Sequence, residues 1–357
     1  MDFSYNFPAI TGIQAERQYY VAMVPLRMIP RLFPEGDEYV SPEYRAQRRL
    51  NSSRIPIISK YIVENRDTYV FSALAASIDG EYEFFPYSED LSIGELKISM
   101  DARFLINDGQ HRKAAILEAL KQDESLKDES ISVVFFVDEG LARSQQIFTD
   151  LNKHAVKTSN SISELYDFRD PIAVATREMI KEIPVLDRYT DKETDNLGKF
   201  SSNLFTLNTF YKANKRALKG FDSEQCYSEL VHIWNLIIQN IVPLNEMDRG
   251  EISKKALRET YLVTQGVVIQ ALGIVVASCL HYSDNNAQLV NLKKVNWRRN
   301  NRDWQLRTIK ANGRIISSNK AILLTSNMIK HEIGIELSND EQSKEDQFLQ
   351  EITIGKE

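Results

Sequence analysis

The chain has 357 residues, of which 43% are hydrophobic and 26% are charged, as is typical of a folded globular protein. Its 14 glycines and 10 prolines are too few for a collagen-like or low-complexity chain, and its two cysteines exclude a disulfide framework or a cysteine-rich zinc module. The 44 basic and 50 acidic residues give a net charge of −6, which excludes a uniformly basic protein but permits a local basic surface.

The first 160 residues carry the pattern of a mixed α/β domain. Residues 1–20 suggest an N-terminal arm packed on this domain, and strands are expected at 19–26, 68–78, 96–106 and 131–137. The turn Asp79-Gly80 would join the second strand to a paired strand at 82–87. Helices are expected at 42–65, where Pro56 would kink or divide the helix, at 110–120 and at 141–151.

Helical patterns dominate the chain from residue 161 onward. They cover 162–168, 171–182, 205–218, 223–239 and 252–282, and loops are expected at 242–245 and 283–288. The apolar stretch 261–280 contains several polar residues, which favours a buried helix over a membrane span. The sequence therefore predicts an α+β fold: an α/β domain at 1–160, a mainly helical domain at 161–335 and an acidic tail, helical or frayed, at 336–357.

Cys226 and Cys279 are expected to be free thiols in a reducing compartment. We find no basic start followed by a long apolar run, so we expect no secretory signal and a cytoplasmic protein without a membrane partner. The five histidines are widely spaced and show no zinc-binding pattern, so no metal site is expected.

The most informative segment joins an expected strand to an expected helix through Asp108-Gly109. The first N–H groups of a helix lack internal partners and carry partial positive charge, so such a junction can bind an anion. Gly109 would allow close approach of a ligand, Arg112 could fork onto a phosphate, and Gln110 and His111 add hydrogen-bonding groups. Asp108 could cap the helix. An ordinary Asp-Gly turn with a structural histidine explains the same residues, and both interpretations stay open.

The stretch Asp108-Gly109-Gln110-His111-Arg112 resembles the signature of the DGQHR family, and the chain as a whole resembles the DndB family of DNA sulfur modification regulators. Residues 148–154, with Asn152, resemble the family's second signature segment. Residues 297–304, which follow the pattern Trp-x-Arg-x-Asn-x-x-Trp, together with Gly313 and Ile315, resemble its C-terminal basic region. The resemblance covers about residues 20–335, and it implies a regulator of DNA sulfur modification.

The same segment also resembles the ParB and sulfiredoxin superfamily, in which Gly-x-x-Arg binds nucleotide phosphates. Gly109, Arg112 and Ala115 match the spacing Gly-x-x-Arg-x-x-Ala. The cysteine of sulfiredoxins is replaced by Gln110, which excludes their reductase chemistry. This resemblance implies a ParB-like first domain with a phosphate or nucleotide pocket formed by Gly109, Gln110, Arg112 and Asn152, and Asp108 and His111 would be the candidates for any catalytic role.

Residues 293–314 hold eight basic residues and one acidic residue, Asp303, a net charge of +7. The basic residues are Lys293, Lys294, Arg298, Arg299, Arg302, Arg307, Lys310 and Arg314. Arginine forks suit phosphates and guanine edges, and the interleaved Trp297 and Trp304 could stack on bases or belong to the core.

A second candidate DNA surface lies on one helix face and a third at 45–49. The second comprises Lys212, Lys215, Arg216 and Lys219, and the third Arg45, Arg48 and Arg49. Each of these runs could equally be a solvated face.

Three functions remain open at this point. The first is a DNA-binding transcriptional repressor that acts on the promoter of a DNA phosphorothioate modification operon. Such a repressor could be a homodimer that reads paired half-sites. The second is a nucleotide-binding or nucleotide-hydrolysing protein that uses Asp108–Arg112, and nucleotide is then the one cofactor to consider. The third is a non-enzymatic assembly factor for other DNA-modification proteins.

Overall fold

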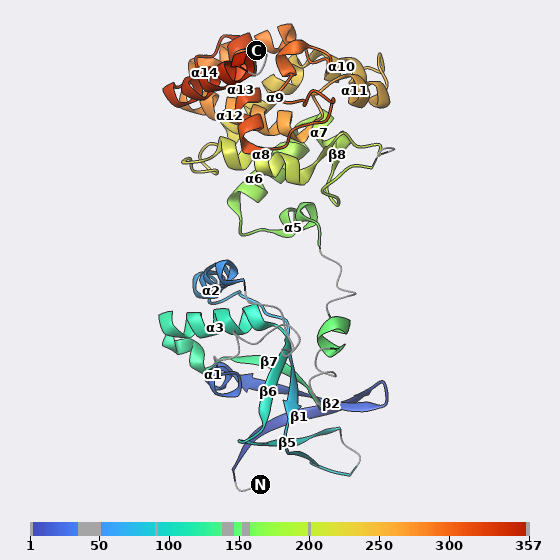
Figure 1. Ribbon diagram of the computed structural model, residues 1–357, viewed down its shortest axis with the longest axis vertical. Helices are drawn as coiled ribbons and strands as arrows, with labels where there is room; N and C mark the ends of the chain where they lie inside the picture. The colour runs from blue at the N-terminus through green and yellow to red at the C-terminus, as the bar shows by residue number, and fades with distance from the viewer. Residues whose placement is uncertain are drawn as a thin grey trace. The chain divides into compact units, whose positions relative to one another are not determined.

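The computed structural model describes residues 3–34, 51–89, 92–137, 146–151, 158–198 and 201–354. The chain forms two compact units, Met1–Val156 and Lys157–Glu357, and each unit has its own hydrophobic core. Figure 1 shows a sheet with helices in the first unit and an almost entirely helical second unit. The predicted α+β fold is confirmed.

The first unit is built on a seven-stranded sheet with the order β4-β5-β1-β2-β7-β3-β6. Neighbouring strands are antiparallel except β3 and β7, which are parallel. The strands are β1 (Ser4–Gln14), β2 (Arg17–Pro25), β3 (Leu74–Asp79), β4 (Tyr82–Pro86), β5 (Ile93–Ser99), β6 (Arg103–Asp108) and β7 (Ser130–Val137).

One face of this sheet is covered by helices. The helical segments are η1 (Leu26–Met28), α1 (Ile29–Leu32), η3 (Ser52–Arg54), α2 (Ile55–Glu64), α3 (Gln110–Gln122) and η4 (Glu124–Asp128), and residues 146–151 are also helical. Alternate residues of the central strands, such as Ala22 and Val133, are buried in the core because successive strand side chains point to opposite faces. Helices α2 and α3 pack against each other (Figure 1).

The first unit differs from the sequence-based expectation in its strand pairing. The expected N-terminal arm is β1, which lies between β2 and β5 in the sheet. The expected hairpin across Asp79-Gly80 does not form, because β3 already has β6 and β7 as neighbours and β4 pairs with β5 instead. The single strand expected at 96–106 is two strands, β5 and β6. Pro56 lies in the first turn of α2, which loses no hydrogen bond to proline, and residues 42–50 of the expected helix lie outside the described residues.

The second unit packs its helices around α12 (Gly266–His281), most of whose residues are buried. At Gly273 a Cβ atom would lie 2.4 Å from the backbone oxygen of Ala213, so glycine lets α12 and α8 approach closely. The other helices are α5 (Asn160–Tyr166), α6 (Pro171–Glu182), α7 (Pro184–Tyr189), α8 (Leu207–Ala217), α9 (Tyr227–Asn240), α10 (Val242–Asp248), α11 (Lys254–Thr260), α13 (Asn319–Ile333) and α14 (Asn339–Ile354). Two 3-10 helices, η5 (Ser283–Lys294) and η6 (Arg302–Trp304), and two short parallel strands, β8 (Thr190–Asp191) and β9 (Phe205–Thr206), complete the unit.

Three expectations for the second unit need correction. The helix expected at 252–282 is interrupted after α11, where the Leu262 N–H donates to the Trp297 carbonyl at 3.0 Å. The loop expected at 242–245 begins α10, with Pro243 in its first turn. The expected acidic tail contains α14, whose Glu341, Glu345 and Phe348 are buried, so this segment belongs to the folded unit.

The described part of the chain contains no helix that has both the length and the apolar content needed to cross a membrane. Cys226 and Cys279 are free, as predicted. Burial raises the pKa of the Cys279 thiol to about 12.

Candidate functional site

The predicted strand–turn–helix around Gly109 forms as expected. Asp108 ends β6, Gly109 occupies the left-handed region with φ +99°, and α3 begins at Gln110. A Cβ atom at Gly109 would lie 2.4 Å from Cδ2 of Leu74. Glycine is therefore required here by the backbone conformation and by the close packing of this turn on β3.

Protein acceptors surround the guanidinium of Arg112. Nη1 donates to the carbonyl oxygens of Ser72 at 2.8 Å and Ala73 at 2.6 Å and to the hydroxyl of Ser72, and Nη2 donates to Asp108 Oδ2 at 2.5 Å. The Arg112 side chain is 17% exposed. Arg112 thus ties the chain before β3 to the first turn of α3, and a phosphate would have to displace these acceptors.

Asp108 and His111 also contact neighbouring protein groups. The expected helix cap by Asp108 does not form, because Gly109 occupies the N-cap position and the Asp108 carboxylate pairs with Arg112. His111 Nε2 accepts a hydrogen bond from the Asn51 N–H at 3.0 Å, which links α3 to η3. Gln110 is partly exposed in the first turn of α3. Asn152, the remaining predicted member of this pocket, and the third basic run at 45–49 lie outside the described residues.

The basic segment 293–314 is anchored by its two tryptophans. Trp297 and Trp304 are buried, and their rings stack with centroids 5.8 Å apart. Their Nε1 groups donate to the carbonyl oxygens of Leu292 at 3.3 Å and Asn296 at 2.8 Å. The hypothesis that these rings stack on nucleic-acid bases is therefore wrong, and they belong to the core.

Seven cations of this segment point to solvent, and we call them the basic surface. Arg299 is partly exposed and the others are exposed; the set is Lys293, Lys294, Arg298, Arg299, Arg302, Lys310 and Arg314. No ion pair joins any of them to another residue in the part of the chain that the structure describes. The Arg298 guanidinium lies over the Tyr261 ring, 5.1 Å from its centroid, which leaves its charge uncompensated.

Arg307 does not belong to the basic surface, although the sequence predicted that it would contact DNA. Its Nη2 pairs with Glu345 Oε1 of α14 at 2.5 Å, and its guanidinium lies 4.5 Å from the centre of the Phe348 ring. The side chain is 13% exposed. A carboxylate that is distant in sequence therefore turns this arginine inward.

The predicted basic face of α8 has acidic neighbours. Lys212, Lys215 and Lys219 are exposed, but Arg216 is partly buried, and burial lowers its pKa. Its guanidinium donates to Asn319 at 2.7 Å. Lys212 and Lys215 lie near Glu164, whose Oε2 is buried without a hydrogen-bond partner.

Burial raises the pKa of Glu164 to about 7, Lys212 opposes this shift, and Asp195 and Asp170 add to it. These carboxyl groups lie among the lysines of the α8 face. The α8 face is therefore less suited to a polyanion than the basic surface is.

Helix α11 carries cations that the sequence reasoning missed. It ends where the Arg299 N–H donates to the Thr260 carbonyl at 2.9 Å, directly beside the basic surface. Lys255 on this helix is exposed, whereas Lys254 donates to the Ser202 carbonyl and Arg258 donates to the carbonyls of Gly198 and Ser201. The run Lys254-Lys255 is visible in the sequence, but its proximity to residues 298–299 depends on the fold.

A comparison with known families gives a match over nearly the whole chain. The sequence model of the family DndB, described as DNA-sulfur modification-associated, matches residues 7–336. The chain belongs to the DndB family. Membership in the DndB family connects the chain with DNA sulfur modification. The matched residues end at 336, before helix α14 begins. Comparisons with curated proteins and with solved structures gave no match.

Proposed function

We propose that the chain is a DNA-binding transcriptional repressor of a DNA phosphorothioate modification operon. Membership in the DndB family supports a role in this modification system. The observation that carries the proposal is the basic surface: seven cations within residues 293–314 that have no ion pairs to described residues, on a chain with a net charge of −6. Its partner would be the double-stranded DNA of the operon's promoter, and a homodimer would present two such surfaces to paired half-sites.

The basic surface has the chemistry that duplex DNA requires. Lysine and arginine bind phosphates with release of counterions, so the affinity depends steeply on salt. Its arginines can also bind a guanine edge through two hydrogen bonds from a rigid planar fork, which lysine lacks. The buried stack of Trp297 and Trp304 holds the backbone that carries Arg298, Arg299 and Arg302. This anchoring limits the entropy that these residues would lose on binding.

A mobility-shift titration on the operon's own upstream DNA tests the proposal. We expect Arg298→Ala/Arg299→Ala to weaken binding and to make the slope of log K against log salt shallower by about 1.8, at about 0.9 per lost phosphate contact. Lys212→Ala/Lys215→Ala removes the same charge from α8 and is expected to change binding much less. Equal losses in both variants, or wild-type affinity that stays flat between roughly 50 and 200 mM salt, would contradict the proposal.

Nucleotide binding at Asp108–Arg112 is a second candidate function. The left-handed Gly109 directly before the 13-residue helix α3 favours it. The contacts of Arg112 with Ser72 and Ala73 weigh against it, since a phosphate would have to compete with them. Separate calorimetric titrations with ATP, CTP and GTP test this function. It fails if none of the three binds, and hydrolysis would be assayed only for a nucleotide that does.

A further inference from the structure

Helix α14 presents carboxylates to basic side chains of the second unit. It carries five acidic residues and one lysine. Three of the carboxylates each hold one cation from the preceding segment: Glu341 holds Lys330 at 2.6 Å, Glu345 holds Arg307 at 2.5 Å and Glu351 holds Lys320 at 2.7 Å.

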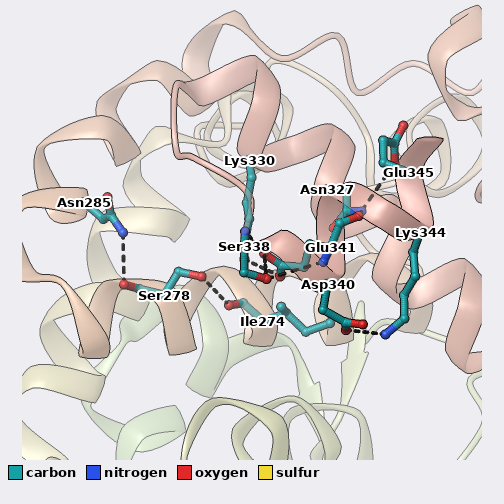
Figure 2. A network of polar contacts seen from close by, with 10 residues as sticks. All are labelled: Ile274, Ser278, Asn285, Asn327, Lys330, Ser338, Asp340, Glu341, Lys344 and Glu345. Atoms are coloured by element: carbon teal, nitrogen blue, oxygen red, sulfur yellow. Dashed lines mark hydrogen bonds and ion pairs between the residues drawn. The ribbon is translucent and has the colours of Figure 1, made fainter.

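The contact between α14 and α13 includes a network of polar side chains (Figure 2). Asn327 Nδ2 donates to the Glu341 carbonyl at 3.0 Å and to Glu345 Oε2 at 3.4 Å, and the Ser338 N–H donates to Glu341 Oε2 at 3.0 Å. Two polar atoms at this contact, Asn327 Oδ1 and Arg307 Nη1, are buried without a hydrogen-bond partner. A contact made of ion pairs and unmet hydrogen bonds is weaker, and more sensitive to competing ions, than an apolar one.

Of the three ion pairs, only the one nearest the C-terminal end of α14 is exposed to solvent, since the Arg307 and Glu345 side chains are 13% and 12% exposed. The side chains of Lys330 and Glu341 are 2% and 12% exposed, whereas those of Lys320 and Glu351 are 55% and 50% exposed. A cavity of about 350 Å³ lies at this end, lined by Arg307, Lys320, Phe348 and Glu351 among others. The two buried pairs thus hold α14 at Glu341 and Glu345, and its packing is incomplete beside the cavity near Glu351.

We propose that α14 is an acidic lid that competes with DNA phosphates for Arg307 and Lys320. When the lid is docked, its carboxylates occupy these two cations. When α14 lifts from Glu345 onward, Arg307 joins the basic surface, in whose segment it lies between Arg302 and Lys310, and Lys320 loses its carboxylate. The inference rests on the proposed function, because it describes how the same DNA-binding surface is regulated.

The test compares two variants of the full chain that remove the same charge from α14. Glu345→Gln/Glu351→Gln releases Arg307 and Lys320. Asp340→Asn/Asp346→Asn is the control, because these carboxylates contact only Lys344 and Gln342 of α14 itself in the described structure. In DNA titrations at several salt concentrations we expect tighter binding for the first variant, and a slope of log K against log salt that is steeper by about 1.8. Equal slopes in the two variants would overturn the proposal.

A milder variant covers the case in which loss of Glu345 disrupts the buried contact. Glu351→Gln frees the half-exposed Lys320 alone and is expected to steepen the slope by about 0.9. If wild type binds DNA through Arg298 and Arg299 but the lid variants match the control, the lid is overturned and the proposed function stands. If neither wild type nor any variant binds the DNA, the proposed function fails. Elution of the same proteins from a heparin column then tests the lid proposal. Later elution of Glu345→Gln/Glu351→Gln than of the control supports the lid, and equal elution rejects it.

Discussion

Gly109 is constrained both by its left-handed backbone and by its packing on Leu74. Gly109→Ala would place a Cβ atom against Leu74 in a left-handed backbone, where a side chain is disfavoured. We expect the free energy of unfolding of the first unit to fall by about 1–3 kcal/mol, the usual cost of overpacking. Gly198→Ala is the control, because a Cβ atom there meets nothing within 4 Å. Urea unfolding followed by circular dichroism measures both, and equal stability of the two variants would contradict this account.

Glu164 makes the stability of the second unit depend on pH. Its pKa is raised from an ordinary value of 4.5 to about 7 in the folded protein, chiefly by burial. Between these values the folded protein keeps a proton that the unfolded chain has lost, so the contribution of Glu164 to stability falls as pH rises. We expect Glu164→Gln to remove this contribution, so that the variant loses less stability than wild type between pH 5 and pH 8.

Tryptophan fluorescence can follow the unfolding of the second unit selectively. All three tryptophans, Trp234, Trp297 and Trp304, lie in the second unit, so their emission reports its unfolding and not that of the first unit. Glu259→Gln, at an exposed position on α11, is the matched control. A pH dependence that is the same in Glu164→Gln, in the control and in wild type would show that Glu164 is not responsible.

At the scale of elements, a local signal identified the junction around Gly109, whereas strand pairing could not be predicted. The run from β6 through Gly109 into α3 was predictable because the apolar period changes from two to that of a helix at a turn dipeptide. Strand β1 was missed because Pro8 and Gly12 interrupt its alternation, and its place depends on β2 and β5. The Asp79-Gly80 turn predicted a hairpin, but residues 103–108 and 130–137 supply the neighbours of β3, which no local pattern reveals.

The anchoring of the basic segment can be tested through its tryptophans. Trp304→Phe keeps an aromatic ring but leaves the Asn296 carbonyl with only the longer hydrogen bond from Asn301 Nδ2 at 3.4 Å; the lost bond and the smaller ring are expected to cost about 1–3 kcal/mol. Trp234→Phe is the matched control, because its Nε1 also donates at 2.8 Å, to Asn214, at a site on α9. Thermal unfolding should show similar losses for both variants. DNA affinity should fall several-fold for Trp304→Phe alone. Equal DNA affinities of the two variants would show that this tryptophan does not support DNA binding by the basic surface.

At the scale of the whole molecule, the sequence shows where the basic residues cluster along the chain but not which of them stay available to DNA. The eight basic residues at 293–314 look equivalent in the sequence. Arg307 differs from the rest because Glu345, on a helix that starts at residue 339, folds back onto it. Likewise, the lysines of α8 face the carboxyl group of Glu164 on α5. Long-range charge pairing decides which cations stay available, and a single sequence does not reveal it.

The position of β7 has a consequence for how the first unit is made. This strand joins β2 on one side and β3 on the other, so it links the β4-β5-β1-β2 group to the β3-β6 pair. A nascent chain on the ribosome can complete the sheet only after residues 130–137 have emerged. Until then the two groups share no backbone ladder and expose unpaired strand edges, which are prone to aggregation. Translation that stops before residue 130 should therefore yield two incomplete half-sheets rather than a smaller stable domain.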